Sequence, residues 1–95
     1  MTGIELIAAE RKRQRFSTEW DDNHKDGELA KAAVCYAATE NMREDFSLIR
    51  DVWPFTRAWW KPTPDNRIRE LEKAGALIAA EIDRLLRVGG KVNET

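Results

Sequence analysis

Residues 53–64 constrain the fold more than any other stretch of this sequence. The segment reads WPFTRAWWKPTP and holds three of the four tryptophans and all three prolines. Each proline lacks a backbone N–H and biases the residue before it toward extended geometry, so a regular helix cannot run through the segment. Its tryptophans must pack on something, because together they would expose a large apolar patch. We expect an irregular aromatic connection that either covers a helical core or forms a rim of anchors for a ligand or partner.

The size and composition are those of one globular domain. The chain has 95 residues, 42% hydrophobic and 35% charged, which is enough for a single modest core. Its formal net charge of −1 gives no strong field toward duplex nucleic acid or an anionic membrane. The one cysteine, Cys35, can form no internal disulfide, and no apolar run approaches the ~20 residues that span a bilayer. We expect a cytoplasmic protein with a single helical domain over 1–95 and a frayed tail at 88–95.

The clearest helix follows the aromatic segment. Thr63 is the expected N-cap and Pro64 the first helical residue, while Gly89 and Gly90 mark the end of the helix. Between them, apolar residues recur at alternating intervals of three and four, which is typical of a helix that buries one face. This apolar stripe consists of Ile68, Leu71, Gly75, Ile78, Ile82 and Leu85.

A second helix is predicted to begin near residues 26–28, where Asp26 is the expected cap. Its apolar face is rich in alanine, which favours helix formation and lets a neighbouring helix approach closely. The last helix offers an equally small set for this contact, namely Ala74, Gly75, Ala76, Ala79 and Ala80. We expect an all-α fold in which this helix and the last one form an antiparallel helical hairpin core. An N-terminal helix from about Ile4 toward Trp20 and the aromatic segment would pack across that core, with a short helical turn at 42–52. Because the stripe exceeds what one short helix can cover, we also expect a homo-oligomeric bundle.

An acidic stretch at residues 19–28 contains the best candidate metal ligands. Carboxylates with one imidazole suit a divalent cation, but the spacing matches no calcium-binding loop. A polar loop between two helices explains the same residues, so we assign no metal and no cofactor. The candidate metal ligands in this stretch are Asp21, Asp22, His24 and Glu28.

Basic and aromatic residues indicate a surface for phosphates and bases. Arginine forks match phosphate oxygens, and tryptophan faces stack on bases. The alternative is a solvated helix face with aromatic side chains that plug the open end of the helical pair. We assign no catalytic residue, because Cys35 lies among apolar residues and His24 is the single histidine. The candidate ligand-binding residues are Arg11, Arg15, Arg57, Trp59, Trp60 and Lys61.

Several stretches along the chain form one characteristic set. They are Glu10-Arg11 with Gln14, DDNH at 21–24, GELAKAAVCYA at 27–37, Trp53-Pro54, WWKP at 59–62 and KAGALIAAEIDR at 73–84. In these the chain resembles small, mostly uncharacterised proteins of tailed phages and prophages, although relatives often have histidine where this chain has Trp20. A looser, architectural likeness is to phage proteins that sequester cyclic nucleotide signals of bacterial defence. Those proteins are short, helical and oligomeric, and they bind ligands between subunits with basic and aromatic residues.

Three hypotheses about function follow. The first, which the resemblance implies, is a non-enzymatic phage accessory protein that counters host defence by binding and sequestering a nucleotide-derived signal. The second is an inhibitor that binds a host protein through the tryptophan-rich segment, since tryptophans are frequent interface hot spots. The third is a metal-dependent nucleotide hydrolase that uses the candidate metal ligands.

Overall fold

The computed structural model describes residues 1–14, 18–44 and 46–89, and in these residues every regular element is helical. The predicted all-α class is therefore confirmed. The elements are α1 (Gly3–Arg13), α2 (Thr18–Asn23), α3 (Glu28–Ala37), α4 (Glu40–Glu44), α5 (Phe46–Val52), a short 3-10 turn η1 (Arg57–Trp59) and α6 (Arg67–Arg87). Within this described part, no helix combines the length and the apolar character needed to cross a membrane.

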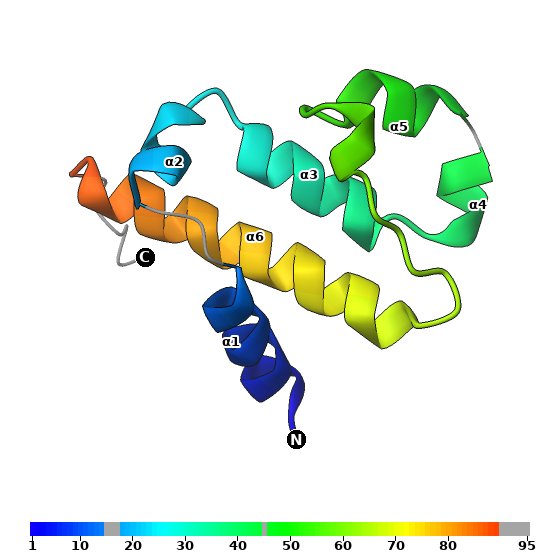
Figure 1. Ribbon diagram of the computed structural model, residues 1–95, viewed down its shortest axis with the longest axis horizontal. Coiled ribbons are helices and arrows are strands. Elements are labelled where there is room, and N and C mark those ends of the chain that lie inside the picture. The colour runs from blue at the N-terminus through cyan, green and yellow to red at the C-terminus, as the bar shows by residue number, and fades with distance from the viewer. Residues whose placement is uncertain (15–17, 45, 90–95) are drawn as a thin grey trace, which may run out of the picture.

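Helices α3 and α6 enclose the core. They lie side by side and run in opposite directions in Figure 1, where α3 is cyan to teal and α6 yellow to orange. The buried core is made mostly of small side chains, so the two backbones can approach closely. It comprises Leu29, Ala32, Ala33, Tyr36, Ala74, Leu77 and Ala80. Four aromatic side chains, Trp20, Trp53, Phe55 and Trp60, pack against this cluster from outside.

The face of α6 that meets α3 is the predicted small one, to which Ala74 and Ala80 belong, and not the stripe of large aliphatic residues. The large residues of the stripe remain about half exposed, from 45% for Leu85 to 62% for Ile68. The alanine-rich face of α3 instead packs on the alanines of α6 and on Leu77. In the stripe, Gly75 alone is closely covered, by Ile7 of α1. Small side chains on α3 thus select the small face of α6, and the large aliphatic residues point elsewhere.

The predicted helix ends are partly wrong. Asn66, and not Thr63, caps α6, because the Asn66 side chain accepts a hydrogen bond from the Arg69 N–H at 3.2 Å. Thr63 begins the preceding turn, in which its carbonyl accepts from the Asn66 N–H at 2.8 Å. At the other end, Gly89 takes φ +83° just after the helix, as its predicted role requires. Most of the predicted tail, residues 90–95, lies outside the described residues.

The N-terminal region is also divided differently. The predicted helix toward Trp20 is replaced by α1, which ends at Arg13, and by the separate short helix α2. Thr2 and Glu5 form a capping box that starts α1. Before α3 the N-cap is Gly27 at φ +86°, a backbone conformation that glycine adopts readily, and not the predicted Asp26.

A buried carboxylate joins the start of α6 to the end of α3. The Glu70 side chain is 1% exposed and accepts hydrogen bonds from Arg43, from Arg67 at 3.2 Å and from the Thr63 N–H at 3.0 Å. The same two guanidinium groups donate to the last carbonyl oxygens of α3, which have no partner inside the helix. Those acceptors are Cys35 and Tyr36 for Arg43, and Tyr36, Ala37 and Ala38 for Arg67. Burial opposes ionisation of Glu70, but these hydrogen bonds outweigh it and lower its pKa.

Helix α1 docks on α6 through one close apolar contact and an ionic cluster. A Cβ on Gly75 would lie 2.4 Å from Ile7 Cδ1, so only glycine allows this approach. Nearby, the buried Glu10 pairs with Arg13 at 2.9 Å and with Arg69. In Figure 1, α1 meets the middle of α6 on the side away from α3.

We predict that Glu70→Gln lowers the free energy of unfolding by about 3 kcal/mol at neutral pH, because it leaves two partly buried arginines without their carboxylate. Since the folded-state pKa of Glu70 lies below the unfolded value, its contribution is present at neutral pH and is lost as the pH falls through the folded pKa. Urea denaturation at neutral and at acid pH measures both effects. The control is Asp51→Asn, which breaks the exposed Arg50–Asp51 pair and should change stability by less than about 1 kcal/mol. Equal losses for the two variants would contradict the prediction.

We also predict that Gly75→Ala lowers the free energy of unfolding by about 1 kcal/mol, because the clash with Ile7 exceeds the gain in helix propensity. Removing the obstructing side chain in the double variant G75A/I7A should recover part of this loss. Urea denaturation of the two single variants and the double variant measures the coupling. Gly3→Ala is the matched control, since nothing lies within 4 Å of a Cβ there. Strict additivity of the two substitutions would show that α1 does not dock at Gly75.

Candidate binding site

The aromatic segment separates two cavities, and its adjacent tryptophans border different ones. Trp60 and Arg57 line a cavity next to α4 and the start of α6, which we call the Arg43 cavity. Trp59 and Lys61 line a second one, which we call the aromatic cavity, between α1, α3 and α6. The structure therefore divides these four of the six predicted ligand-binding residues between two cavities.

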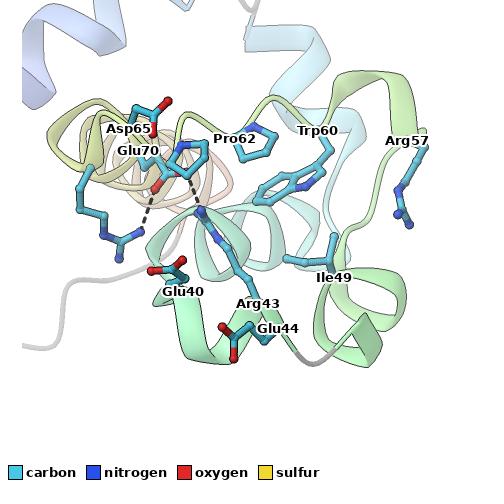
Figure 2. Close-up of a pocket in the computed structure, with 11 residues that line it drawn as sticks. Glu40, Arg43, Glu44, Ile49, Arg57, Trp60, Pro62, Asp65 and Glu70 are labelled. Atoms are coloured by element: carbon cyan, nitrogen blue, oxygen red, sulfur yellow. Dashed lines mark hydrogen bonds and ion pairs between the residues drawn. The ribbon is translucent and has the colours of Figure 1, made fainter.

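The Arg43 cavity is the larger of these two, at about 670 Å³, and its charge is unsuited to phosphate (Figure 2). Trp60 forms an aromatic wall, and the Arg43 guanidinium lies 5.2 Å from the centre of its ring. Arg43 and Arg67 are both hydrogen-bonded to Glu70, while Arg57 lies at the far edge in Figure 2. The acidic lining residues are Glu40, Glu44, Asp65 and Glu70, which outnumber the three arginines. An anion placed here would meet carboxylates as well as cations.

The aromatic cavity has a volume of about 380 Å³ and walls that are mostly aromatic. Phe55 lies at the centre of the ring cluster, with centroid distances of 5.6 Å to Trp20, 5.6 Å to Trp53 and 5.5 Å to Trp59. These contacts hold the rings in place before any ligand arrives. The full lining is Glu10, Gln14, Trp20, Ala32, Tyr36, Trp53, Phe55, Trp59, Lys61, Lys73 and Leu77.

Two lysines give this cavity its cationic character. Lys73 Nζ donates a hydrogen bond to the Lys61 carbonyl at 2.9 Å and lies 5.3 Å from the centre of the Tyr36 ring. Among the described residues, Lys73 makes no ion pair with a carboxylate. Burial lowers the pKa of Lys73, and the positive charges of Arg69 and Lys61 lower it further. An anion in the cavity would offset both the cost of burying the charged ammonium and the repulsion from the neighbouring cations.

Two other polar groups of the wall, the Glu10 carboxylate and the Tyr36 hydroxyl, already have partners. Glu10 is ion-paired with Arg13 and Arg69, and hydrogen bonds from these arginines lower its pKa although burial acts in the opposite direction. The Tyr36 hydroxyl accepts a hydrogen bond from the Lys61 N–H at 3.2 Å, and burial raises the pKa of this phenol. The cavity thus combines flat apolar walls with two lysines, of which Lys73 is held in place by its hydrogen bond to the Lys61 carbonyl.

One of the predicted phosphate contacts, Arg11, lies elsewhere. The Arg11 guanidinium lies 3.4 Å from Asp21 Oδ2 and 3.6 Å from Asp83 Oδ2, where it ties α1 to α2 and α6. It does not line either cavity described above. Arg15 lies outside the described residues.

The four candidate metal ligands do not converge. Asp21 is fully buried beside Arg11, and Asp22 pairs with Arg87 at 2.9 Å. His24 Nδ1 lies 2.7 Å from the Trp20 carbonyl oxygen, and Glu28 accepts from the Asp26 N–H at 2.6 Å. Across residues 1–14, 18–44 and 46–89, no three His, Cys, Asp or Glu side chains gather as a metal site would require. Cys35 is buried, and burial raises the pKa of its thiol, so it remains protonated.

Sequence reasoning missed Lys73, Tyr36 and Gln14 as lining residues. For Lys73 a signal was present, because it shares a helical face with Leu77 and Ala80, at i+4 and i+7. A lysine on the face that packs into the core is a candidate binding group. The position of Gln14 depends on how α1 docks on α6, and no local sequence pattern predicts that docking.

Comparison of the chain with protein-family models, with curated proteins and with solved structures yields no match.

Proposed function

We propose that this protein binds a small nucleotide-like ligand in the aromatic cavity and holds it without chemical change. The observation that carries this proposal is the pairing of five aromatic side chains with the unpaired ammonium of Lys73. Stacking a base on an aromatic side chain contributes about 1–3 kcal/mol and tolerates different bases. A phosphate next to Lys73 would add a charge-assisted hydrogen bond.

The resemblance to phage proteins suggests a role for such binding. In that role, the protein would accumulate in the cytoplasm of an infected cell and sequester a nucleotide-derived signal of host defence. Sequestration needs tight binding and no turnover, which fits a wall built from rings and lysines, with its carboxylate neutralised by arginines.

Binding of a host protein through the tryptophan-rich segment has less support. Hot spots are clusters of large side chains that a partner buries together. Trp53 and Trp60 are instead packed against Tyr36, at centroid distances of 5.7 and 4.8 Å, and Trp59 is the tryptophan of this segment that stays exposed, at 51%. One exposed ring is a small anchor for a protein partner.

We also propose that the protein self-associates through the exposed apolar stripe of α6. Ile78, Ile82 and Leu85 are each about half exposed and follow one another at intervals of four and three, the spacing of a helix–helix seam. The charges around them pair within the chain, as Glu81 with Arg84 and Asp22 with Arg87. In a two-fold contact the same surface of both copies meets, so unpaired charges beside the stripe would face their own kind. Because these charges are already paired within the chain, we propose a second copy of this chain as the partner.

To test ligand binding, we suggest calorimetry against cyclic dinucleotides and cyclic ADP-ribose isomers. At least one should bind, and Trp59→Ala or Lys73→Gln should weaken that binding about tenfold, since each removes a contact worth about 1–3 kcal/mol. Arg57→Gln is the matched control, because Arg57 lines the other cavity, and it should leave the affinity unchanged. No heat of binding across the panel would refute the proposal.

Self-association can be tested by analytical ultracentrifugation at micromolar concentrations. We expect the wild type to sediment as an oligomer and Ile82→Lys to shift it to the monomer, because a charge would be buried in the contact. Ala30→Lys adds the same charge at an exposed position of α3 and should not change the oligomeric state. A monomeric wild type, or an oligomer that tolerates Ile82→Lys, would argue against this surface.

A further inference from the structure

Gln14 is in an unusual position for a polar side chain. It caps the C-terminal end of α1, where its backbone N–H donates to the Glu10 carbonyl at 2.9 Å, and it borders the aromatic cavity. Its side-chain oxygen is enclosed by protein atoms and accepts no hydrogen bond from the described residues. Most buried amide oxygens have a donor, because leaving one unpaired destabilises the folded state.

No described group of the cavity wall donates to this oxygen. The cavity lining includes the rings of Trp20, Trp53 and Phe55. Lys73 directs one N–H to the Lys61 carbonyl, and Glu10 is an acceptor, not a donor. The terminal torsion of a glutamine is broad, so a small rotation can turn its oxygen toward the cavity. A ligand with an N–H group could then satisfy it.

Lys73, by contrast, has N–H donors for which no acceptor is described. An ammonium group has three N–H donors, and one of them is used by the Lys61 carbonyl. The nearby carboxylate of Glu10 is already shared between Arg13 and Arg69. The remaining donors of Lys73 suit an anionic group on the ligand.

We infer that the aromatic cavity selects a planar heterocycle with an amino or ring N–H donor and an attached phosphate, with Gln14 accepting from the donor and Lys73 binding the anion. This inference rests on the proposed function, since it requires a ligand in that cavity. The volume of about 380 Å³ lies near the lower end of the range for small-molecule sites, about 300–1,000 Å³. One protomer therefore accommodates a single mononucleotide unit, alone or as part of a larger signal.

Three small nucleotide probes test the contact with Gln14 and the contact with Lys73 separately. Adenosine 5′-monophosphate has both the amino group and the phosphate, purine riboside 5′-monophosphate lacks the amino group, and adenosine lacks the phosphate. Titrations followed by tryptophan fluorescence should show that adenosine 5′-monophosphate binds about tenfold more tightly than either analogue, because each analogue leaves a buried group unpaired. Since these comparisons use the wild-type protein, they do not depend on how well a variant folds.

Two variants then assign the contacts to residues. Gln14→Leu should bind both monophosphates equally, and Lys73→Gln should bind adenosine 5′-monophosphate and adenosine equally. Gln14→Met provides a second unbranched replacement if Gln14→Leu unfolds, and circular dichroism reports the fold of each.

The outcomes distinguish this inference from the proposed function. If all three probes bind with the same affinity, ligand binding stands and the inference is wrong. Discrimination that persists in Gln14→Leu or Gln14→Met would show that another group reads the amino donor, which also overturns the assignment. If neither these probes nor the cyclic nucleotides bind at all, the proposed function fails and the inference fails with it.

Discussion

The ion cluster around Glu70 determines how the rest of the chain is arranged. A carboxylate that is 1% exposed could not remain ionised there without Arg43 and Arg67, and these two arginines also satisfy the last carbonyl groups of α3. The cluster therefore fixes the end of α3 against the start of α6. It also holds the Thr63 N–H, where the aromatic segment enters α6. At this end the aromatic segment is held by the hydrogen bond to Glu70, and elsewhere by the packing of its rings.

The packing of the rings has a consequence for the candidate site. Trp53 donates its indole N–H to the Thr56 carbonyl and packs on Tyr36, which folds the segment back onto α3. From there the chain passes through η1, and neighbouring tryptophans border opposite cavities. The cavity that Trp59 lines has rings and lysines, whereas in the one that Trp60 lines Arg43 and Arg67 are already bound to Glu70. Which tryptophan can stack on a ligand therefore depends on the surroundings of each ring and not on their proximity in sequence.

Much of the helical framework could be predicted from the sequence, because helix periodicity, proline and glycine act locally. The pairing of the small faces of α3 and α6 could be predicted as well, because alanine-rich faces let two helices approach closely. What lies against the stripe of large aliphatic residues could not be predicted, since the approach of Ile7 to Gly75 joins segments that are far apart in the chain. The same limit applies to the site. Arg11 belongs to a basic run in the sequence, but its role is set by Asp21 and Asp83, which the fold brings beside it.

The way α1 is attached links the aromatic cavity to ionic strength. This helix supplies Glu10 and Gln14 to the cavity wall, and ion pairs with Arg69 and Glu72 contribute much of its hold on α6. Added salt weakens pairs that are partly exposed, so it loosens one wall of the cavity without touching the rings. A ligand that contacts Gln14 has the opposite effect, because it fastens α1 to the rest of the molecule. If the cavity binds the ligand proposed above, its occupancy and the docking of α1 on α6 would strengthen each other.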